Sequence, residues 1–255
     1  MNIKKNLIIN LHILNFMNKK ILNQNTFFFN SLLNHIESDF EFSNKSINRF
    51  NKILSQKDEK KQSKLEELSK LIKKINSIEN CKLKKNSNSL IVGDGNIFSP
   101  LMVIGETPGL EEDKSGLTYQ GEVGNLLRKM FLAINVKLEN MYKTYSVNFR
   151  PPDDRKPSSQ EIRRYSFFLK EHIAIIDPKI IVLLGGSAME ALTGSNNKIT
   201  DERGKWKEII LKNKSYPFII TYNPSYLIRY PEYKKYSWED LKKIKIKIKD
   251  LKIQI

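Results

Sequence analysis

The chain has 255 residues, of which 40% are hydrophobic, and its formal net charge at pH 7 is +16. This length supports one globular core plus an appendage. The charge suits a polyanionic partner such as nucleic acid or a membrane surface, although the abundance of Lys, Asn and Ile can raise the pI without creating a binding face. The single cysteine, Cys81, excludes an internal disulfide and argues against a multi-cysteine metal site, and no apolar run is long enough to span a bilayer.

Residues 1–62 are interpreted as an N-terminal extension and linker, partly helical or disordered. Lys4-Lys5 and the apolar stretch after it have the outline of a secretory signal, but polar residues interrupt the stretch and no small-residue cleavage site follows. We therefore expect a cytoplasmic protein. Leu22–Ile36 can form a short amphipathic helix, and Ser43–Gln62, rich in Ser, Asn, Lys and Asp, is typical of a linker.

Residues 63–255 are predicted to form an α/β domain. The domain begins at Ser63, because Ser63-Lys-Leu-Glu66 has capping-box spacing and an apolar helical stripe follows it. The predicted strands are Leu101–Gly105, Thr144–Asn148, Ile180–Leu184 and Phe218–Thr221. The predicted helices are Val123–Ala133, Ser158–Ile176, Ser187–Leu192 and Tyr236–Ile255. Strands that alternate with helices predict a three-layer α/β/α sandwich around a mostly parallel, four-stranded sheet.

Two of these strands end in loops that carry polar groups. Gly105–Gly109 (Gly-Glu-Thr-Pro-Gly) follows one apolar run, and Tyr222–Arg229 follows another about a hundred residues later. Ligands of open α/β sheets bind at the carboxyl ends of the strands, so the two loops are the candidate active site. Glu106 is the candidate catalytic carboxylate; the plainer alternative is a solvated carboxylate near a helix.

Several segments resemble the motifs of the family 4 uracil-DNA glycosylases, in the family's order along the chain. They lie within residues 105–127, 150–157, 178–185, 203–206 and 223–229. The resemblance covers about Ile78 to Asp240. It implies the uracil-DNA glycosylase fold and the hydrolysis of the N-glycosidic bond of uracil, or of a related deaminated base, in DNA. That reaction is the first step of base excision repair.

The resemblance also implies roles for residues of the pocket. Glu106 would position water and stabilise positive charge on the sugar, while Asn223, which replaces a family histidine, would donate to the leaving base. Tyr119 stands at the position of a base-stacking phenylalanine. Tyr145 stands at the position of the uracil-reading asparagine, and Asn148 could substitute for that asparagine. The expected base-binding residues are Gly105, Thr107, Tyr119, Tyr145 and Asn148.

The implied DNA contacts come from the second loop and from three arginines. Leu227 falls where a glycosylase loop pushes an apolar wedge into the base stack, and Pro224 and Ser225 would pinch the phosphate backbone. The arginines would contact phosphates, with a surface ion pair as the alternative for each. They are Arg150, Arg155 and Arg229.

Four other polar residues are expected to lie outside the catalytic machinery. Asp113 would brace the first loop, whereas its neighbours Glu111 and Glu112 belong to an acidic run of the kind that is usually solvated. His172 lies beside Ile173 within a predicted helix and is expected to be structural.

The chain departs from the family at the metal site. Family 4 enzymes hold a 4Fe–4S cluster with four cysteines, and the corresponding positions here are Ile78, Cys81, Phe149 and Tyr165. One thiolate cannot hold such a cluster. We therefore predict no metal and no other cofactor, with aromatic packing in the place of the cluster.

The substitutions at Tyr145 and Asn223 leave an alternative, a catalytically silent relative that binds DNA without cleaving it. Activity requires room for a pyrimidine between Tyr119 and Asn223, whereas in a silent protein Tyr145 would fill that space. A third reading is a glycosylase domain attached to a replication or repair partner through the N-terminal extension. Under each reading we expect a monomer that binds DNA and no membrane.

Overall fold

The structure is a computed structural model that describes the backbone of residues 49–255 and the side chains of residues 61–255. The signal-like segment and the helix expected at Leu22–Ile36 lie outside the described residues. Leu54–Ile255 form one compact unit, which contains every predicted site residue.

The first described helix, α3 (Arg49–Asn76), begins before the predicted domain start at Ser63. Residues 49–62, part of the segment that was expected to be a partly helical or disordered extension and linker, belong to this helix. Lys, Glu and Gln are good helix formers, so a charged composition does not by itself indicate a linker. The apolar stripe expected after Ser63 is present, because Leu68, Leu71 and Ile75 are buried in the core.

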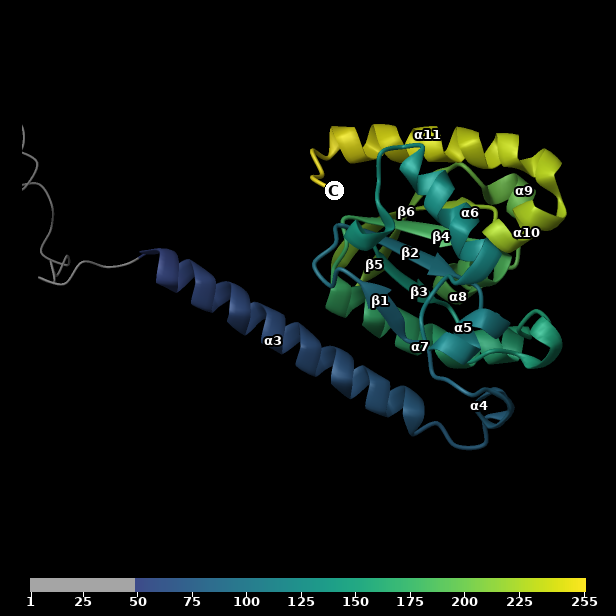
Figure 1. The fold of residues 1–255 in the computed structure, drawn as a ribbon, viewed down its shortest axis with the longest axis horizontal. Helices are drawn as coiled ribbons and strands as arrows, with labels where there is room; N and C mark the ends of the chain where they lie inside the picture. Colours follow the sequence, from purple (N-terminus) through teal and green to yellow (C-terminus); the bar gives the residue numbers. More distant parts are fainter. Residues whose placement is uncertain (1–48) are drawn as a thin grey trace, which may run out of the picture. The chain divides into compact units, whose positions relative to one another are not determined.

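A six-stranded sheet lies at the centre of the compact unit (Figure 1), with the strand order β1-β3-β2-β4-β6-β5. The strands are β1 (Gly93–Gly95), β2 (Leu101–Gly105), β3 (Tyr142–Tyr145), β4 (Ile180–Leu184), β5 (Trp206–Leu211) and β6 (Lys214–Thr221). The four central strands are parallel, as predicted. The edge strands β1 and β5 pair antiparallel and were not predicted, because neither contains a long apolar run.

Helices cover both faces of the sheet (Figure 1), which confirms the three-layer α/β/α architecture. One core contains side chains of α3, of α7 (Ser159–Ile176) and of α8 (Gly186–Thr193). The other contains side chains of α6 (Gly121–Leu132), α10 (Pro224–Arg229) and α11 (Lys234–Asp250). The short helices are α4 (Lys82–Asn86), α5 (Leu110–Ser115), α9 (Ile199–Glu202), η1 (Leu138–Asn140), η2 (Pro152–Asp154) and η3 (Pro231–Tyr233). No helix in the described part of the chain is long and apolar enough to cross a membrane.

Alternation along the parallel strands divides their side chains between the two cores. Val103 and Val182 face the core that contains α6 and α11, whereas Ile104 and Leu183 face the core that contains α7. The two central strands β2 and β4 are buried on both faces and at every position, as parallel strands normally are. This burial explains why β2 and β4 have the predicted bounds.

Strand β3 differs from its prediction, since it ends at Tyr145 instead of Asn148. Tyr145 pairs with Gly105, the last residue of β2, so both residues lie at the carboxyl edge of the sheet. The residues between Tyr145 and Asn148 form a loop instead of extending the strand. This shift decides which side chain of the segment faces the candidate site.

Candidate functional site

A cavity of about 420 Å³ lies at the carboxyl edge of the parallel strands. It is lined by residues 106–112, 119, 120, 122, 123, 145, 154–157, 223, 225 and 229. The loops after β2 and β6 thus meet in one place, as the strand-end argument predicts. Of the predicted site residues, Glu106, Thr107, Tyr119, Tyr145, Arg155, Asn223, Ser225 and Arg229 line the cavity.

Both carboxylate oxygens of Glu106 are held by donors of the protein. Oε1 accepts a hydrogen bond from the backbone N–H of Ser187 at 3.0 Å, and Oε2 accepts one from Nδ2 of Asn223 at 3.0 Å. Glu106 is therefore fixed at the cavity wall and is not a loosely solvated carboxylate. Two charge-assisted bonds hold the orientation that a base acting on water needs.

Gly185, a residue that sequence reasoning missed, makes room for Glu106. It has a φ of +105°, and a Cβ atom on it would lie 2.5 Å from Cδ of Glu106. A side chain at this position is excluded both by backbone strain and by the space that Glu106 occupies. The signal in the sequence was the Gly185-Gly186 pair directly after β4.

Asn223 presents its amide nitrogen to Glu106 because its oxygen is used elsewhere. Oδ1 accepts from the backbone N–H of Ser225 at 3.0 Å and from its hydroxyl at 3.1 Å, and this caps helix α10. The cap fixes the side-chain amide with its NH2 group toward the carboxylate. Since an NH2 group has two hydrogens, one remains for a ligand in the cavity.

Two tyrosines form the aromatic wall of the cavity. The rings of Tyr119 and Tyr145 lie 4.9 Å apart with an interplanar angle of 32°, and both side chains are buried. The hydroxyl oxygen of Tyr145 accepts a 2.9 Å hydrogen bond from the backbone N–H of Tyr119. Tyr145 therefore packs against the predicted stacking ring and occupies one of its backbone donors.

Burial shapes the chemistry of this aromatic wall. It raises the pKa of both phenols well above the usual value, and the charge of Glu112 adds to the effect in both. The hydroxyl of Tyr119 has no hydrogen-bond partner among residues 61–255. Gly105 allows the ring of Tyr145 to lie close to the backbone, since a Cβ atom on Gly105 would lie 2.9 Å from that ring.

Three predicted roles do not fit the structure. Asn148 is buried outside the cavity and donates from Nδ2 to the carbonyl of Ile91 at 3.0 Å, so it does not substitute for a base-reading amide. Leu227 is 1% exposed and packs in the core, so it is not an apolar wedge. Pro224 is also buried and does not line the cavity, which leaves Ser225 alone at the expected phosphate pinch.

The three arginines differ in how their charge is used. Arg150 forms an ion pair with Asp154 at 2.7 Å, and Arg155 pairs with Glu161 at 2.7 Å. The hydrogen bonds from Arg155 lower the pKa of Glu161 to about 2. Arg229 is exposed at the cavity and forms no ion pair within the described residues. Arg229 is thus the arginine whose charge is available to a phosphate.

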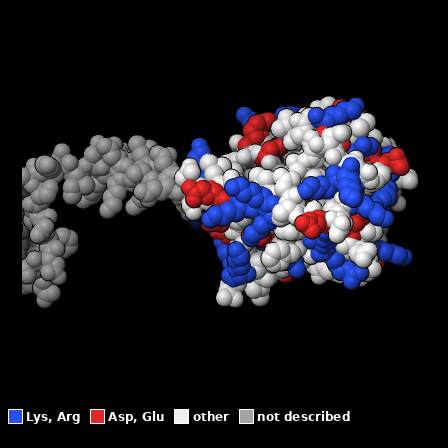
Figure 2. Space-filling view, turned by 90° about the horizontal axis from the view of Figure 1, so that it is seen from below, with Lys and Arg blue, Asp and Glu red and all other residues white. Residues whose placement is uncertain are grey.

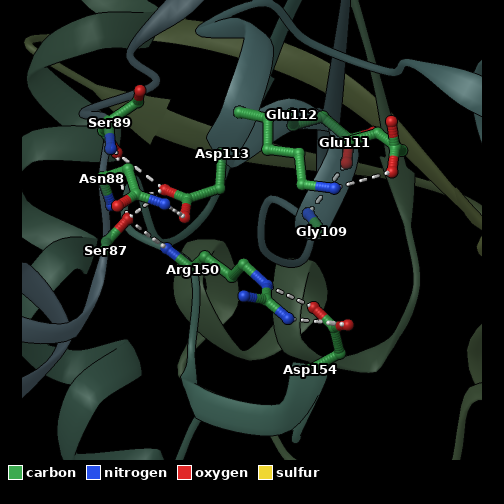
Figure 3. A network of polar contacts seen from close by, with 10 residues as sticks. Ser87, Asn88, Ser89, Gly109, Glu111, Glu112, Asp113, Arg150 and Asp154 are labelled. Carbon is green, nitrogen blue, oxygen red and sulfur yellow. Dashed lines mark hydrogen bonds and ion pairs between the residues drawn. The ribbon is translucent and has the colours of Figure 1, made fainter.

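Asp113 braces the first loop, as expected (Figure 3). Its carboxylate accepts hydrogen bonds from the side chain of Ser87, from the backbone and side chain of Asn88 and from the backbone of Ser89. Burial raises the pKa of Asp113, but these bonds outweigh burial and leave the pKa below its usual value. The carboxylate ties α5 to the segment after α4.

Glu112, in contrast to the prediction, is buried and not solvated. Its carboxylate accepts hydrogen bonds from the backbone N–H groups of Gly109 at 3.0 Å and Gln120 at 2.9 Å. The first of these bonds, drawn in Figure 3, caps helix α5. Glu112 therefore joins the Glu106 loop to the segment that carries Tyr119, whereas Glu111 remains exposed.

His172 is structural, as expected. It is 2% exposed, and its Nε2 lies 2.9 Å from the hydroxyl of Tyr142. Burial lowers the pKa of His172 to about 4. The imidazole is therefore neutral near pH 7 and lies in a helix that faces the core, away from the cavity lining.

The four positions of the family's metal site lie together and are filled by packed side chains. Sγ of Cys81 is 3.3 Å from the hydroxyl of Tyr165, whose ring lies edge-on to Phe149 at 6.3 Å, and Ile78 packs against the same core. These residues supply one thiol and do not fit a cluster that needs four thiolates. No group of three or more His, Cys, Asp or Glu residues is placed to hold a metal ion in the described part of the chain.

Positive charge is spread over the face of the molecule that Figure 2 shows. On the face shown in Figure 2, Lys and Arg side chains are scattered among acidic and uncharged residues and do not form one continuous track. This distribution agrees with compositional bias as a source of part of the net charge.

The sequence matches known proteins over the region that builds the cavity. The model of the uracil DNA glycosylase superfamily matches residues 92–242. The chain is 34% identical over 188 residues to the type-4 uracil-DNA glycosylase of Thermotoga maritima, which covers 72% of this chain and 96% of that protein. It is 34% identical over 189 residues to the corresponding enzyme of Sulfurisphaera tokodaii, covering 71% and 84% of the two chains.

A further similarity links the same region to a much longer protein. The chain is 28% identical over 160 residues to a DNA polymerase of Bacillus phage SP01, covering 62% of this chain and 17% of the polymerase. The family match spans more than half of the chain and includes Glu106, Tyr119, Tyr145 and Asn223. With the parallel sheet and the strand-end cavity in place, this match shows that the chain belongs to the uracil DNA glycosylase superfamily.

Proposed function

We propose that the protein is a DNA glycosylase that hydrolyses the N-glycosidic bond of uracil, or of a related deaminated base, and so initiates base excision repair. The observation that carries the proposal is the pair of Glu106 and Asn223, held 3.0 Å apart at the wall of the cavity. The type-4 uracil-DNA glycosylases among the relatives support uracil in DNA as the substrate. DNA is accordingly the proposed partner.

Glu106 would act at the sugar. Bond cleavage gives the sugar oxocarbenium character, and a nearby carboxylate stabilises the positive charge and orients or deprotonates the attacking water. The donors from Ser187 and Asn223 keep Glu106 in place without a change of rotamer during the reaction. Preorganised groups of this kind need no rearrangement as the charge develops.

Asn223 would act at the departing base. As the bond breaks, the base gains negative charge, and the second hydrogen of the Asn223 amide can donate to a carbonyl oxygen of the base. Arg229 would hold a neighbouring phosphate, because its charge is unpaired within residues 61–255. Phosphate contacts fix the position of the strand and leave recognition of the base to the cavity.

The test uses an oligonucleotide with one uracil opposite guanine, followed by alkaline cleavage at abasic sites. The full chain should cleave the strand, and Glu106→Gln should reduce the rate by about 100-fold or more. Glutamine has nearly the same size as glutamate but no negative charge. Its single side-chain oxygen can accept from only one of the two donors that bind Glu106 in the wild type. A wild-type protein that is folded and binds DNA but produces no cleavage would refute the proposal.

A second candidate function is favoured by Tyr145. Its ring packs against Tyr119 and its hydroxyl accepts from the Tyr119 N–H at the cavity wall. In a catalytically silent, DNA-binding relative Tyr145 would fill the space between Tyr119 and Asn223. Because the cavity still has a volume of about 420 Å³ and Glu106 is in place, cleavage remains the leading function. The same assay with hypoxanthine and other lesions separates altered specificity from silence.

We extend the proposal to the cofactor: the protein works without an iron–sulfur cluster, and the packing of Cys81, Phe149 and Tyr165 takes over the structural task. Protein purified without oxygen should contain no stoichiometric iron or sulfide, and it should lack absorbance near the visible bands of such clusters. Stoichiometric iron that is lost in Cys81→Ala would contradict this part of the proposal.

The remaining proposals concern the localisation, the oligomeric state and the partners of the protein. A monomer in the cytoplasm suits a protein that acts on DNA, and gel filtration with light scattering tests its oligomeric state. The N-terminal extension would dock onto a replication or repair partner. The similarity of the glycosylase region to part of a phage DNA polymerase supports such an attachment. Co-purification of replication or repair proteins with the full chain tests it.

A further inference from the structure

Three tyrosine rings pack in a row from the core to the surface, in the segment that also contributes Asn223, Ser225 and Arg229 to the cavity. The rings of Tyr222 and Tyr226 lie 5.4 Å apart with an interplanar angle of 13°, and those of Tyr226 and Tyr230 lie 4.7 Å apart at 39°. We call these three residues the tyrosine column. Tyr226 lies in helix α10, whereas Tyr222 precedes the helix and Tyr230 is its C-cap.

The column runs from the core to the surface. Tyr222 is 3% exposed and belongs to the core that contains α6 and α11, whereas Tyr230 is 46% exposed. Tyr233 lies edge-on to both Tyr222 and Tyr226, at 5.3 Å from each, and so fixes the inner rings. The outer ring, Tyr230, thus packs against Tyr226 and lies edge-on to Tyr233 at 6.5 Å, while nearly half of it is exposed to solvent.

The column begins next to the candidate catalytic pair. Tyr222 directly precedes Asn223, whose amide contacts Glu106, and Ser225 and Arg229 of the same helix line the cavity. A strand with one nucleotide in the cavity would thus have its neighbouring nucleotides near α10. The column therefore lies where the nucleotides next to a bound lesion would be, which makes nucleic-acid bases its expected ligand.

Two positive side chains lie close in the sequence to the exposed Tyr230. Arg229 precedes Tyr230 and its Nε donates to the carbonyl of Ser225 at 3.3 Å. Lys234 is exposed, and neither it nor Arg229 forms an ion pair within the described residues. Glu232, between Tyr230 and Lys234 in the sequence, is also exposed, so Arg229 and Lys234 leave one net positive charge in this segment. An exposed aromatic ring near positive charge is the combination that binds single-stranded nucleic acid, because bases stack on the ring and phosphates pair with the cations.

We propose that the tyrosine column is a binding site for unpaired DNA bases next to the lesion. A base continues the stack on Tyr230, while Arg229 and Lys234 contact the phosphates of that strand. A base can stack on Tyr230 only after it leaves its partner, so the protein prefers single-stranded or frayed DNA to a closed duplex. The inference rests on the proposed function for DNA as the ligand, but not on cleavage.

The experiment measures fluorescence anisotropy of the full chain with a uracil-free single-stranded oligonucleotide and with the matching duplex. Tyr230→Ala should weaken single-strand binding by about 5- to 100-fold, the range for loss of one base–aromatic stack. Tyr230→Trp should keep the affinity. Phe167→Ala is the matched control, because Phe167 is a 66% exposed aromatic residue on α7, on the opposite face of the sheet. Duplex binding should change little in all three variants.

A second oligonucleotide separates stacking from other effects of the substitution. When the nucleotides are abasic, wild-type and Tyr230→Ala proteins should bind with equal affinity, because no base is left to stack. Equal binding of the normal single strand by wild type and Tyr230→Ala would overturn the inference, as would an equal loss on the abasic strand. Because the oligonucleotides contain no uracil, a protein that fails to cleave uracil but loses single-strand affinity in Tyr230→Ala refutes the glycosylase proposal alone.

Discussion

Asn223 donates to Glu106 across a 3.0 Å hydrogen bond that joins the loops after β2 and β6. The bond has a direction, because the other end of the Asn223 amide caps α10 through Ser225. Helix α10 therefore fixes the donor, and the donor fixes the carboxylate. The catalytic geometry that we propose is thus linked to the stability of one short helix.

The two tasks of Asn223 can be separated by substitution. Asn223→Ser should keep a capping oxygen but lose the donor to Glu106, so cleavage should fall by about 100-fold while the melting temperature stays near that of the wild type. Asn223→Ala should lose both, with an additional stability loss of about 1 kcal/mol. Single-turnover rates and thermal melts check both effects. Equal rates in wild type and Asn223→Ser would remove the amide from the mechanism.

Gly185→Ala should displace Glu106. The new Cβ atom would lie 2.5 Å from Cδ of Glu106, and the φ of +105° adds backbone strain, so cleavage should be lost with a stability loss of about 1–3 kcal/mol. Gly186→Ala is the control, because a Cβ atom there meets nothing within 4 Å. Activity assays and denaturant melts of the two variants test this. Similar activity in both would mean that Glu106 does not need its present position.

Tyr145→Asn should increase the excision of uracil. The substitution removes the ring that packs against Tyr119, frees the Tyr119 N–H and places an amide with paired donor and acceptor atoms at the end of β3. The measurement is kcat/KM for uracil-containing single strands. Tyr145→Phe, which keeps the ring and loses only the hydroxyl, should not give the increase. A lower rate in Tyr145→Asn would show that Tyr145 itself takes part in base binding.

His172 should make the protein less stable in mild acid. Its pKa is about 4 in the folded state and about 6.5 when unfolded, so between these values the unfolded chain binds the extra proton. Stability that is fully present above pH 6.5 is therefore lost as the pH falls toward 4, by roughly 3 kcal/mol at most. Denaturant melts from pH 7 to 4 should show this slope, and His172→Gln should flatten it. An unchanged slope would exclude His172 as the cause.

The sequence predicted the elements that depend on local pattern. Apolar runs predicted β2 and β4 with their bounds, because a parallel strand buried on both faces has no polar alternation to obscure it. The same rule placed Glu106 and Asn223 in loops at the carboxyl edge. Edge strand β5 and the early start of α3 were not predicted, since a half-exposed strand and a charged helix have patterns that also occur in loops.

The tertiary structure decided which side chains face the cavity and which of the charged ones are paired with an opposite charge. Leu227 and Asn148 lie close in sequence to site residues, yet packing buries both. Arg150 and Arg155 have the same chemistry as Arg229, but of these three arginines only Arg229 lacks a carboxylate partner in the described chain. The Glu106–Asn223 bond joins residues 117 positions apart. A local pattern reports whether a residue is in a strand or a loop, but the partner of a side chain is set by the sheet order, which brings distant segments together.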